Sequence, residues 1–203
     1  FVNIGTSSIY GKDATKSEDA APEPASHYGV TKLAAEQMVK AAHRDRDLPA
    51  CSMRLFSVYG ERERPEKLYP RVYRSIFTGE PFPFYEGSEH HIRSYTYVGD
   101  IIDGLVRVID NFDACNGEIF NLGLDKTITT GEAIKIVEKV AGKKCKYERK
   151  AKRPGDQKVT SANIKKPREL LDYNPTTEPE EGFSKTIKWY EQKILPLIKD
   201  GKL

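Results

Sequence analysis

Two side chains that could act together as an acid–base pair, Tyr28 and Lys32, lie four residues apart in the stretch 26–36, which reads SHYGVTKLAAE. In a helix this spacing places both side chains on one face, where the lysine ammonium favours the ionised form of the phenol. A free tyrosine, with a pKa of about 10, is a poor base at neutral pH, so general acid–base chemistry by a phenol needs such a cation. Because the chain contains 11 tyrosines among many lysines, one such pair is also expected by chance, and a solvated helix face is the alternative.

The segments around this pair predict how it is positioned. Residues 1–5 form a short apolar run that ends at glycine and predicts a buried strand. The hydroxyl-rich turn 6–11 follows, and a polar loop then leads to a helix from Ser26 to about Arg46. In open α/β sheets ligands bind at the carboxyl ends of the strands, which is where this turn lies. The alternative is a Ser/Thr turn that only satisfies its own backbone.

The rest of the chain alternates between strand-like and helix-like segments. Further strands are predicted at 50–56, 82–85, 92–98, 118–122 and 145–148, and helices at 68–78, 99–111, 129–142, 165–172 and 180–195. The helix that follows Thr129 begins with a capping box, T-x-x-E. Strands that alternate with helices predict an α/β fold with a parallel sheet, at least in the first half.

Composition excludes several classes of protein. The 33 basic and 30 acidic residues are interspersed, so the net charge of +3 predicts no nucleic-acid partner. No apolar run is long enough to span a membrane, and no secretory signal opens the chain. Three cysteines far apart in sequence are typical of reduced cytoplasmic thiols, and the His90-His91 pair lacks the spacing of a metal site. We therefore expect a cytoplasmic α/β protein without a metal.

Six stretches, in this order and spacing, resemble the extended short-chain dehydrogenase/reductase family, specifically its NAD-dependent nucleotide-sugar epimerases and dehydratases. They are 6–11 (TSSIYG), 28–32 (YGVTK), 54–60 (RLFSVYG), 93–100 (RSYTYVGD), 120–123 (FNLG) and 153–156 (RPGD), the last followed by Trp189 and Tyr190. Each motif alone is weak, but the ordered set covers essentially the whole chain. The resemblance therefore favours the catalytic interpretation of Tyr28 over the solvated helix face.

The resemblance implies an incomplete Rossmann-type parallel sheet with a smaller mixed α/β substrate-binding domain. Residues 1–56 would be the carboxyl-terminal part of a Rossmann NAD-binding domain, and residues 57–203 the sugar-nucleotide binding region. Within the latter, residues 97–123 would pack back on the Rossmann sheet. The expected cofactor is NAD, the expected partner is a small-molecule nucleotide sugar, and the longer enzyme would be a homodimer.

The resemblance also implies roles for individual residues. Tyr28 would be the acid–base, Lys32 would hold the nicotinamide ribose and polarise the tyrosine, and Thr6 would hydrogen-bond the reacting sugar hydroxyl. Arg93 and Arg153 would pair with the diphosphate, a task that suits the guanidinium fork. The implied substrate-binding set is Thr6, Ser7, Ser8, Ser57, Arg93, Arg153 and Asp156, of which Asp156 would meet the nucleoside ribose.

Several departures from the family pattern are visible. The family usually has Asn at the position of Ser57, and Asp is common at the positions of Ser94 and Gly99. The Gly-rich βα turn that cradles the NAD pyrophosphate does not occur in the sequence, nor does the acidic residue that would follow it. We therefore expect this chain to be the carboxyl-terminal portion of a longer enzyme. The alternative from another class is a non-catalytic fragment that binds a sugar nucleotide or a partner but not NAD.

The turn 6–11 also bears on the reaction. Dehydratases of this family eliminate water with an acidic residue at the positions of Ser7 and Ser8, and no carboxylate lies between Phe1 and Lys12. Reversible oxidation and reduction at one carbon is then the remaining chemistry. The prediction is a UDP-sugar 4-epimerase acting on UDP-glucose, its N-acetyl relative or UDP-glucuronate through a transient 4-keto intermediate. A 4,6-dehydratase or decarboxylase of the same family is the alternative.

Overall fold

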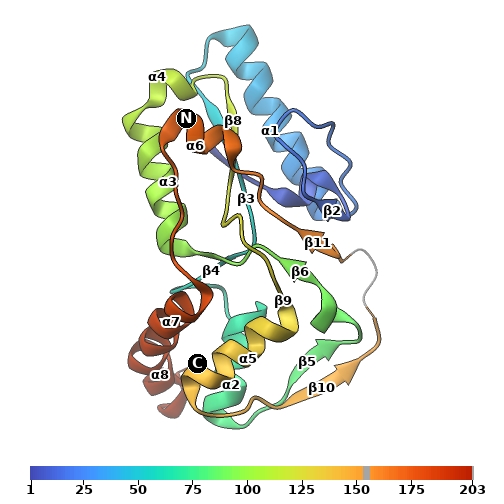
Figure 1. Cartoon of the computed structure of the whole chain (residues 1–203), viewed down its shortest axis with the longest axis vertical. Helices are drawn as coiled ribbons and strands as arrows, with labels where there is room; N and C mark the ends of the chain where they lie inside the picture. Colours follow the sequence, from blue (N-terminus) through green and yellow to red (C-terminus); the bar gives the residue numbers. More distant parts are fainter. Residues whose placement is uncertain (153–155, 203) are drawn as a thin grey trace. The chain divides into compact units, whose positions relative to one another are not determined.

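The computed structural model describes residues 1–152 and 156–202 of the 203-residue chain. The chain divides into two compact units, each of which is assembled from three segments (Figure 1). Unit 1 comprises 1–58, 92–128 and 154–176, and unit 2 comprises 59–91, 129–153 and 177–203.

A three-stranded parallel sheet organises unit 1. It consists of β1 (Val2–Thr6), β3 (Cys51–Leu55) and β8 (Ile119–Leu122), with β3 in the centre. Figure 1 shows α1 (His27–Arg46) and α3 (Val98–Asp110) on opposite sides of these strands. The parallel sheet of an α/β protein is thus confirmed, and the three strands lie where the apolar runs of the sequence predicted them.

Alternation along β3 divides its side chains between the two faces of the sheet. Arg54 reaches Glu36 of α1, so this position faces α1. Met53, one residue earlier, belongs to the apolar core together with Ile101 and Val108 of α3. The central strand is therefore buried on both faces, as is usual for parallel sheets.

The remaining elements of unit 1 are short. They are η1 (Ser7–Tyr10), β2 (Asp13–Ala14), β6 (Ile92–Arg93), β7 (Thr96–Tyr97), α4 (Phe112–Cys115), β11 (Val159–Thr160) and α6 (Lys165–Leu171). Strand β11 pairs in parallel with both β2 and β6, which brings three distant parts of the sequence together. Two of the boundaries between the units fall within short strands, β4 (Val58–Tyr59) and β9 (Ile128–Thr129).

The single strand predicted over 92–98 is wrong. The structure contains β6 and β7 instead, interrupted at Ser94 and Tyr95, and α3 begins already at Val98. Ser94 is fully buried, and its Oγ accepts a hydrogen bond from the backbone N–H of Ala162 at 2.9 Å. Ala162 is 68 residues away in sequence, and its buried backbone N–H finds its hydrogen-bond acceptor in the Ser94 side chain.

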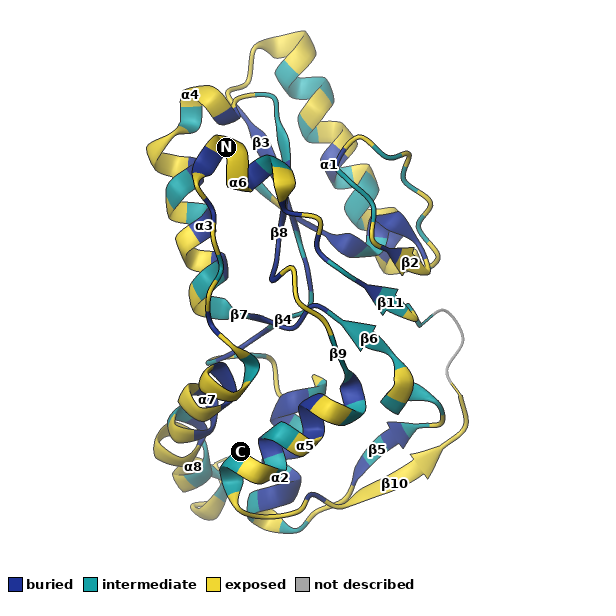
Figure 2. Ribbon diagram, viewed as in Figure 1, coloured by how far each residue is buried: buried dark blue, intermediate teal, exposed yellow. Residues whose placement is uncertain are grey.

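Unit 2 contains helices and a two-stranded ribbon. Its elements are α2 (Leu68–Thr78), β5 (Phe82–Tyr85), η2 (Ser88–His90), α5 (Thr130–Ala141), β10 (Tyr147–Lys150), α7 (Pro179–Lys193) and α8 (Leu195–Lys199). Strand β10 pairs in parallel with β5 and is exposed along its length, whereas β5 alternates between buried and half-buried residues (Figure 2). The capping box predicted at Thr129 is confirmed, because its side chain and that of Glu132 bond each other's backbone N–H groups.

Buried aromatic side chains form the centre of unit 2. Tyr59, Tyr69 and Phe183 pack with ring centroids 4.3–5.9 Å apart, and Tyr73 packs against Tyr190 at 5.5 Å. Such contacts bury large apolar areas in a small unit. Among the described residues, no helix combines the length and the apolar character needed to cross a membrane.

Candidate active site

The first turn of α1 presents Tyr28. Ser26 is the N-cap, and its Oγ accepts a hydrogen bond from the N–H of Gly29 at 3.1 Å. Gly29 lies so close to η1 that a Cβ atom there would be 2.8 Å from the carbonyl oxygen of Ser8. The first turn therefore packs directly against the turn that follows β1. Tyr28 itself is 56% exposed, so its side chain is accessible to a ligand.

Lys32, one turn further along α1, reaches the edge of the sheet. Its Nζ donates a hydrogen bond to the carbonyl oxygen of Ile4 in β1 at 2.6 Å. The carbonyl of Phe1 accepts a hydrogen bond from the N–H of Cys51 in β3, so the backbone carbonyls of Phe1 and every second residue after it point toward β3. The carbonyls of Ile4 and Thr6 therefore point away from β3. Residues i and i+2 of a strand are about 7 Å apart, so the contact of Lys32 with Ile4 lies about 7 Å along β1 from Thr6.

Thr6 ends β1 and caps η1. Its Oγ1 accepts from the N–H of Ser8 at 3.2 Å and lies 3.3 Å from the Ser8 hydroxyl oxygen. Thr6 and Ser7 are buried, whereas Ser8 is half-buried. The turn thus satisfies part of its own backbone, as the alternative interpretation proposed. The first turn of α1 packs against this turn through Gly29.

Arg93 is connected to the same turn through Gln157, the residue that follows Asp156 in the sequence. The Arg93 guanidinium donates to the carbonyl of Ile92 at 2.9 Å and to the carbonyl of Gln157. The Gln157 side chain in turn donates to the carbonyl of Gly11 at 2.7 Å. Sequence reasoning missed Gln157, since nothing in its local pattern links it to a partner 146 residues earlier. Arg153, predicted to bind diphosphate, lies outside the described residues.

Ser57, where the family usually has Asn, follows β3. Its backbone φ is 35°, in the left-handed region that non-glycine residues seldom adopt. Its Oγ lies 3.3 Å from the Thr160 hydroxyl oxygen of β11. The structure therefore places Ser57 at the carboxyl end of the central strand, in the same unit as Thr6, Tyr28, Lys32, Arg93 and Asp156.

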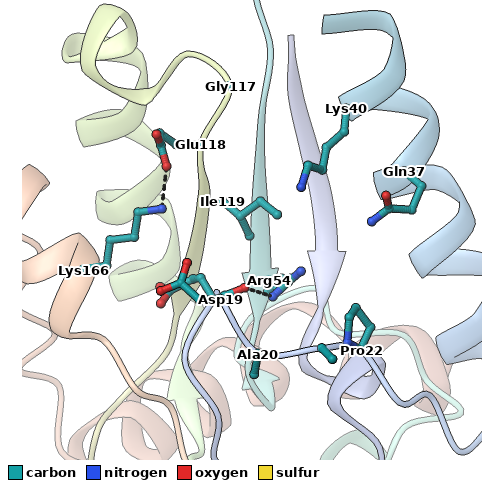
Figure 3. A pocket seen from close by; sticks show the side chains of 12 residues that line it. Asp19, Ala20, Pro22, Gln37, Lys40, Arg54, Gly117, Glu118, Ile119 and Lys166 are labelled. Atoms are coloured by element: carbon teal, nitrogen blue, oxygen red, sulfur yellow. Dashed lines mark hydrogen bonds and ion pairs between the residues drawn. The ribbon is translucent and has the colours of Figure 1, made fainter. Parts of the chain in front are cut away.

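A cavity of about 370 Å³ lies elsewhere in unit 1 (Figure 3). Gln37 and Lys40 line it from α1, and Lys166 and Glu118, paired at 2.6 Å, line it from the start of α6 and of β8. None of the residues predicted to bind cofactor or substrate is among those that line it. Neither Tyr28 nor Lys32 lines the cavity, so the cavity is separate from the candidate active site. The residues around Tyr28 are the better candidates for catalysis, because they include an acid–base pair.

The donor set around Tyr28 fits one end of a dinucleotide. An ammonium and an exposed phenol at the carboxyl end of parallel strands suit a ribose and a reacting hydroxyl. The turn between β1 and α1 has no Gly-rich loop for a pyrophosphate. Among the described residues, no group of three or more His, Cys, Asp or Glu could hold a metal ion.

The chain is similar to known proteins in sequence and in fold. A UDP-glucuronate 4-epimerase of Thermodesulfobacterium geofontis (strain OPF15) is 35% identical over 206 residues, which cover 100% of this chain and 62% of that protein. The crystal structure of a UDP-glucuronic acid 4-epimerase from Bacillus cereus, in complex with UDP-glucuronic acid and NAD, matches with a TM-score of 0.89 and 33% identity. This match covers 95% of our chain and 61% of the other.

A related fold occurs in a dehydratase. The crystal structure of a dTDP-glucose 4,6-dehydratase from Bacillus anthracis (strain Ames), in complex with NAD, has a TM-score of 0.85 at 25% identity, over 95% of this chain and 61% of that one. The chain thus spans about three fifths of the length of each of these relatives. The model of the family described as "NAD dependent epimerase/dehydratase family" matches residues 1–123. With more than half of its residues matched, the chain belongs to the NAD dependent epimerase/dehydratase family.

Proposed function

We propose that the protein carrying this chain is an NAD-dependent 4-epimerase of a UDP-sugar, with UDP-glucuronate as the first substrate to test. The observation that carries the proposal is the exposed Tyr28 phenol on α1, with Lys32 one turn away at the edge of β1. The 4-epimerases among the similar proteins support the choice of reaction and sugar.

In this proposal Tyr28 removes the proton from the sugar C4 hydroxyl and later returns it. Lys32, one turn further along α1, provides the neighbouring cation and would hold the nicotinamide ribose. The Thr6 hydroxyl orients the same sugar hydroxyl from the end of β1. Bound NAD supplies the hydride acceptor and donor, so C4 is oxidised to a ketone and then reduced on its other face.

The turn after β1 favours epimerisation over dehydration. Elimination of water after oxidation needs a further acid and base, and η1 carries no acidic residue. Its first two positions are Ser7 and Ser8, whose hydroxyls can bind a sugar but do not titrate near neutral pH. Within the same proposal Ser57, Arg93, Arg153 and Asp156 bind the nucleoside diphosphate.

The proposal extends to assembly and location. The apolar residues Val30 and Met38 of α1 are 51% and 74% exposed, which supports homodimer formation through this helix. The three cysteines are buried free thiols, as expected for a cytoplasmic protein.

The test is an epimerase assay on the intact protein that carries this chain. UDP-glucuronate is incubated with the NAD-loaded protein, and the C4 epimer is followed by NMR of the sugar ring protons. We expect interconversion to an equilibrium mixture without net release of NADH. Accumulation of a 4-keto-6-deoxy sugar from a UDP-hexose would instead establish a dehydratase.

Tyr28→Phe is the diagnostic variant. We expect it to lower kcat by about 10²–10⁴-fold, the usual contribution of a general acid–base, while the Kd for UDP-glucuronate changes little. Tyr147→Phe is the matched control, because Tyr147 is similarly exposed but lies in unit 2. Full activity of the Tyr28→Phe protein would remove Tyr28 from its role.

A separate measurement concerns the cofactor. Calorimetric titration of NAD into the purified 203-residue chain asks whether these residues alone bind it. Because the chain has no Gly-rich turn for the pyrophosphate, we expect no binding at micromolar concentration. Micromolar binding would mean that the chain completes a cofactor site in another way.

A further inference from the structure

A buried ion pair joins α1 to the central strand. The Arg54 guanidinium donates from Nε to one carboxylate oxygen of Glu36 at 2.9 Å and from Nη2 to the other at 2.7 Å. Arg54 is 2% exposed and Glu36 is 1% exposed. A bidentate pair of this kind has a fixed geometry, so it sets the position of one element against the other.

The same guanidinium continues into a wider network. Its Nη1 donates to the Tyr10 hydroxyl at 2.7 Å and to the carbonyl of Glu18 at 3.0 Å. The Tyr10 hydroxyl donates to Oδ1 of Asn121 at 2.8 Å. The N–H of Asn121 then donates to Oε1 of Glu18 at 2.8 Å. Helix α1, turn η1, strands β3 and β8 and the loop at Glu18 are thereby connected through hydrogen-bonded polar groups.

Three of these residues come from separate motifs of the sequence. Tyr10 lies in the turn 6–11, Arg54 opens the stretch 54–60, and Asn121 lies in 120–123. None of the three has a role in the proposed proton transfer. Tyr10 bonds both Arg54 and Asn121, and Arg54 alone bonds Glu36, so these motif positions belong to one hydrogen-bonded network.

Stability alone is a weak explanation for such a network. Burial of an ion pair costs desolvation energy, and well-packed apolar residues of similar volume often give equal or higher stability. What the network provides is a defined geometry, and the helix it fixes is the one that carries Tyr28 and Lys32.

The spacing along α1 shows what is fixed. Tyr28, Lys32 and Glu36 follow one another at intervals of four residues and thus lie along one face of the helix. Lys32 contacts β1 through the carbonyl of Ile4, and Glu36 contacts β3 through Arg54. Two contacts to neighbouring strands determine both the rotation of α1 about its axis and its position along the sheet.

We propose that Glu36 and Arg54 are positioning residues, which hold the first turn of α1 so that Tyr28 meets the substrate hydroxyl beside Thr6. This inference rests on the proposed function. Glu36 is eight residues from Tyr28, about 12 Å along the helix axis, and therefore acts through the helix and not on the reacting atoms. A displacement of about 1 Å at the reacting groups can cost about 100-fold in rate.

The first test compares Glu36→Gln with wild type in the intact protein. Gln keeps the shape of Glu but removes the charge and one acceptor oxygen. We expect kcat for UDP-glucuronate epimerisation to fall about 10–100-fold, with KM changed less than 3-fold, at a temperature well below the Tm of the variant. Arg54→Lys keeps the charge but cannot form the bidentate pair with Glu36, so it should lower kcat to a similar extent.

The control is Leu171→Ala, a truncation in the apolar core of the same unit. It should lower the Tm but leave kcat at the wild-type level when measured below that Tm. If Leu171→Ala lost as much kcat as Glu36→Gln, the effect of Glu36 would be explained by stability alone, and the positioning role would be refuted. Tyr10→Phe, which removes only one hydroxyl of the network, serves if the Glu36 and Arg54 variants do not fold, and its kcat should fall by less than theirs.

Combination with Tyr28→Phe separates positioning from an independent effect. If Glu36 acts through Tyr28, the double variant Tyr28→Phe/Glu36→Gln should be no slower than Tyr28→Phe alone. Effects that multiply instead would overturn the proposal.

A measurement without activity keeps the inference testable if the proposed reaction is wrong. In a ¹H–¹⁵N NMR spectrum, the amides of Gly29 and Val30, which bond to the Ser26 side chain and carbonyl, report on the first turn of α1. Glu36→Gln should shift both signals, and Leu171→Ala should not. Unchanged signals in Glu36→Gln would overturn the positioning role, whereas shifted signals in a protein without epimerase activity would refute only the proposed function.

Discussion

Ser57 has a backbone conformation that is unfavourable for its side chain. Its φ of 35° is unfavourable for a residue with a Cβ, although Asn tolerates this region better than Ser does. We predict that Ser57→Asn stabilises the protein by about 0.5–1 kcal/mol, measured as the shift of the urea unfolding midpoint. Ser161→Asn is the control, since Ser161 has no positive φ and should gain nothing. A loss of stability in Ser57→Asn would show that the contact with Thr160 matters more than the strain.

Glu63 is a carboxyl group whose environment disfavours its charge. The side chain is half-buried, its Oε2 has no hydrogen-bond partner among the described residues, and burial raises the pKa to about 7 from an ordinary value near 4.5. The folded protein therefore binds the proton more tightly than the unfolded chain does, so the stability contributed by Glu63 is present below about pH 4.5 and is lost as pH rises through about 7.

We predict that Glu63→Gln raises the Tm at pH 8 and that this gain shrinks at pH 5, where Glu63 is already protonated in the folded state. The measurement is thermal unfolding by circular dichroism at both pH values. Glu66→Gln, an exposed carboxylate nearby, is the control and should show no such dependence. A gain of equal size at both pH values would mean that charge burial is not the cause.

At the scale of elements, the packing of α1 on η1 depends on the absence of a side chain at Gly29. Alanine has the higher helix propensity by about 1 kcal/mol, so propensity alone predicts stabilisation by Gly29→Ala. A Cβ there would instead lie 2.8 Å from the Ser8 carbonyl oxygen and 2.9 Å from Pro24 Cβ. We predict a net destabilisation of about 1–3 kcal/mol in urea unfolding.

The same helix supplies the contrast for this prediction. Ala34 is exposed on α1, so Ala34→Gly should cost only the propensity difference of about 1 kcal/mol. Both substitutions would then destabilise, although they are opposite in type. Stabilisation by Gly29→Ala would show that η1 moves aside without cost.

At the scale of the whole molecule, both units protect their thiols. Cys51 and Cys115 are buried in unit 1 and Cys145 in unit 2. Burial raises the pKa of Cys51 to about 11 and that of Cys145 to about 12, and it also raises the pKa of Cys115. Because the thiolate is the reactive form, we predict that a disulfide reagent such as DTNB modifies the folded protein slowly and titrates three thiols after addition of guanidinium chloride. One thiol that reacts within seconds in the folded protein would contradict this picture.

Part of the fold could be predicted because its signals are local. The apolar runs at 1–5, 50–56 and 118–122 became the three strands of the parallel sheet. The cap at Ser26 and the capping box at Thr129 start their helices through contacts within three residues. The alternating segment 92–98 did not form one strand, and at its interruption the buried Ser94 side chain accepts a hydrogen bond from Ala162, 68 positions away. Periodicity carries no information about such a partner.

By itself, the sequence determined the parallel α/β arrangement, the Tyr28–Lys32 spacing and the order of motifs that points to the family. Only the tertiary structure decided what the other motif residues do. Arg54 meets Glu36 across 18 residues of sequence, and Tyr10 meets Asn121 across 111. Caps, turns and helical spacing act over a few residues, whereas these contacts depend on which strands pair and in which register. The register of β1, β3 and β8 brings them together, and no local pattern specifies it.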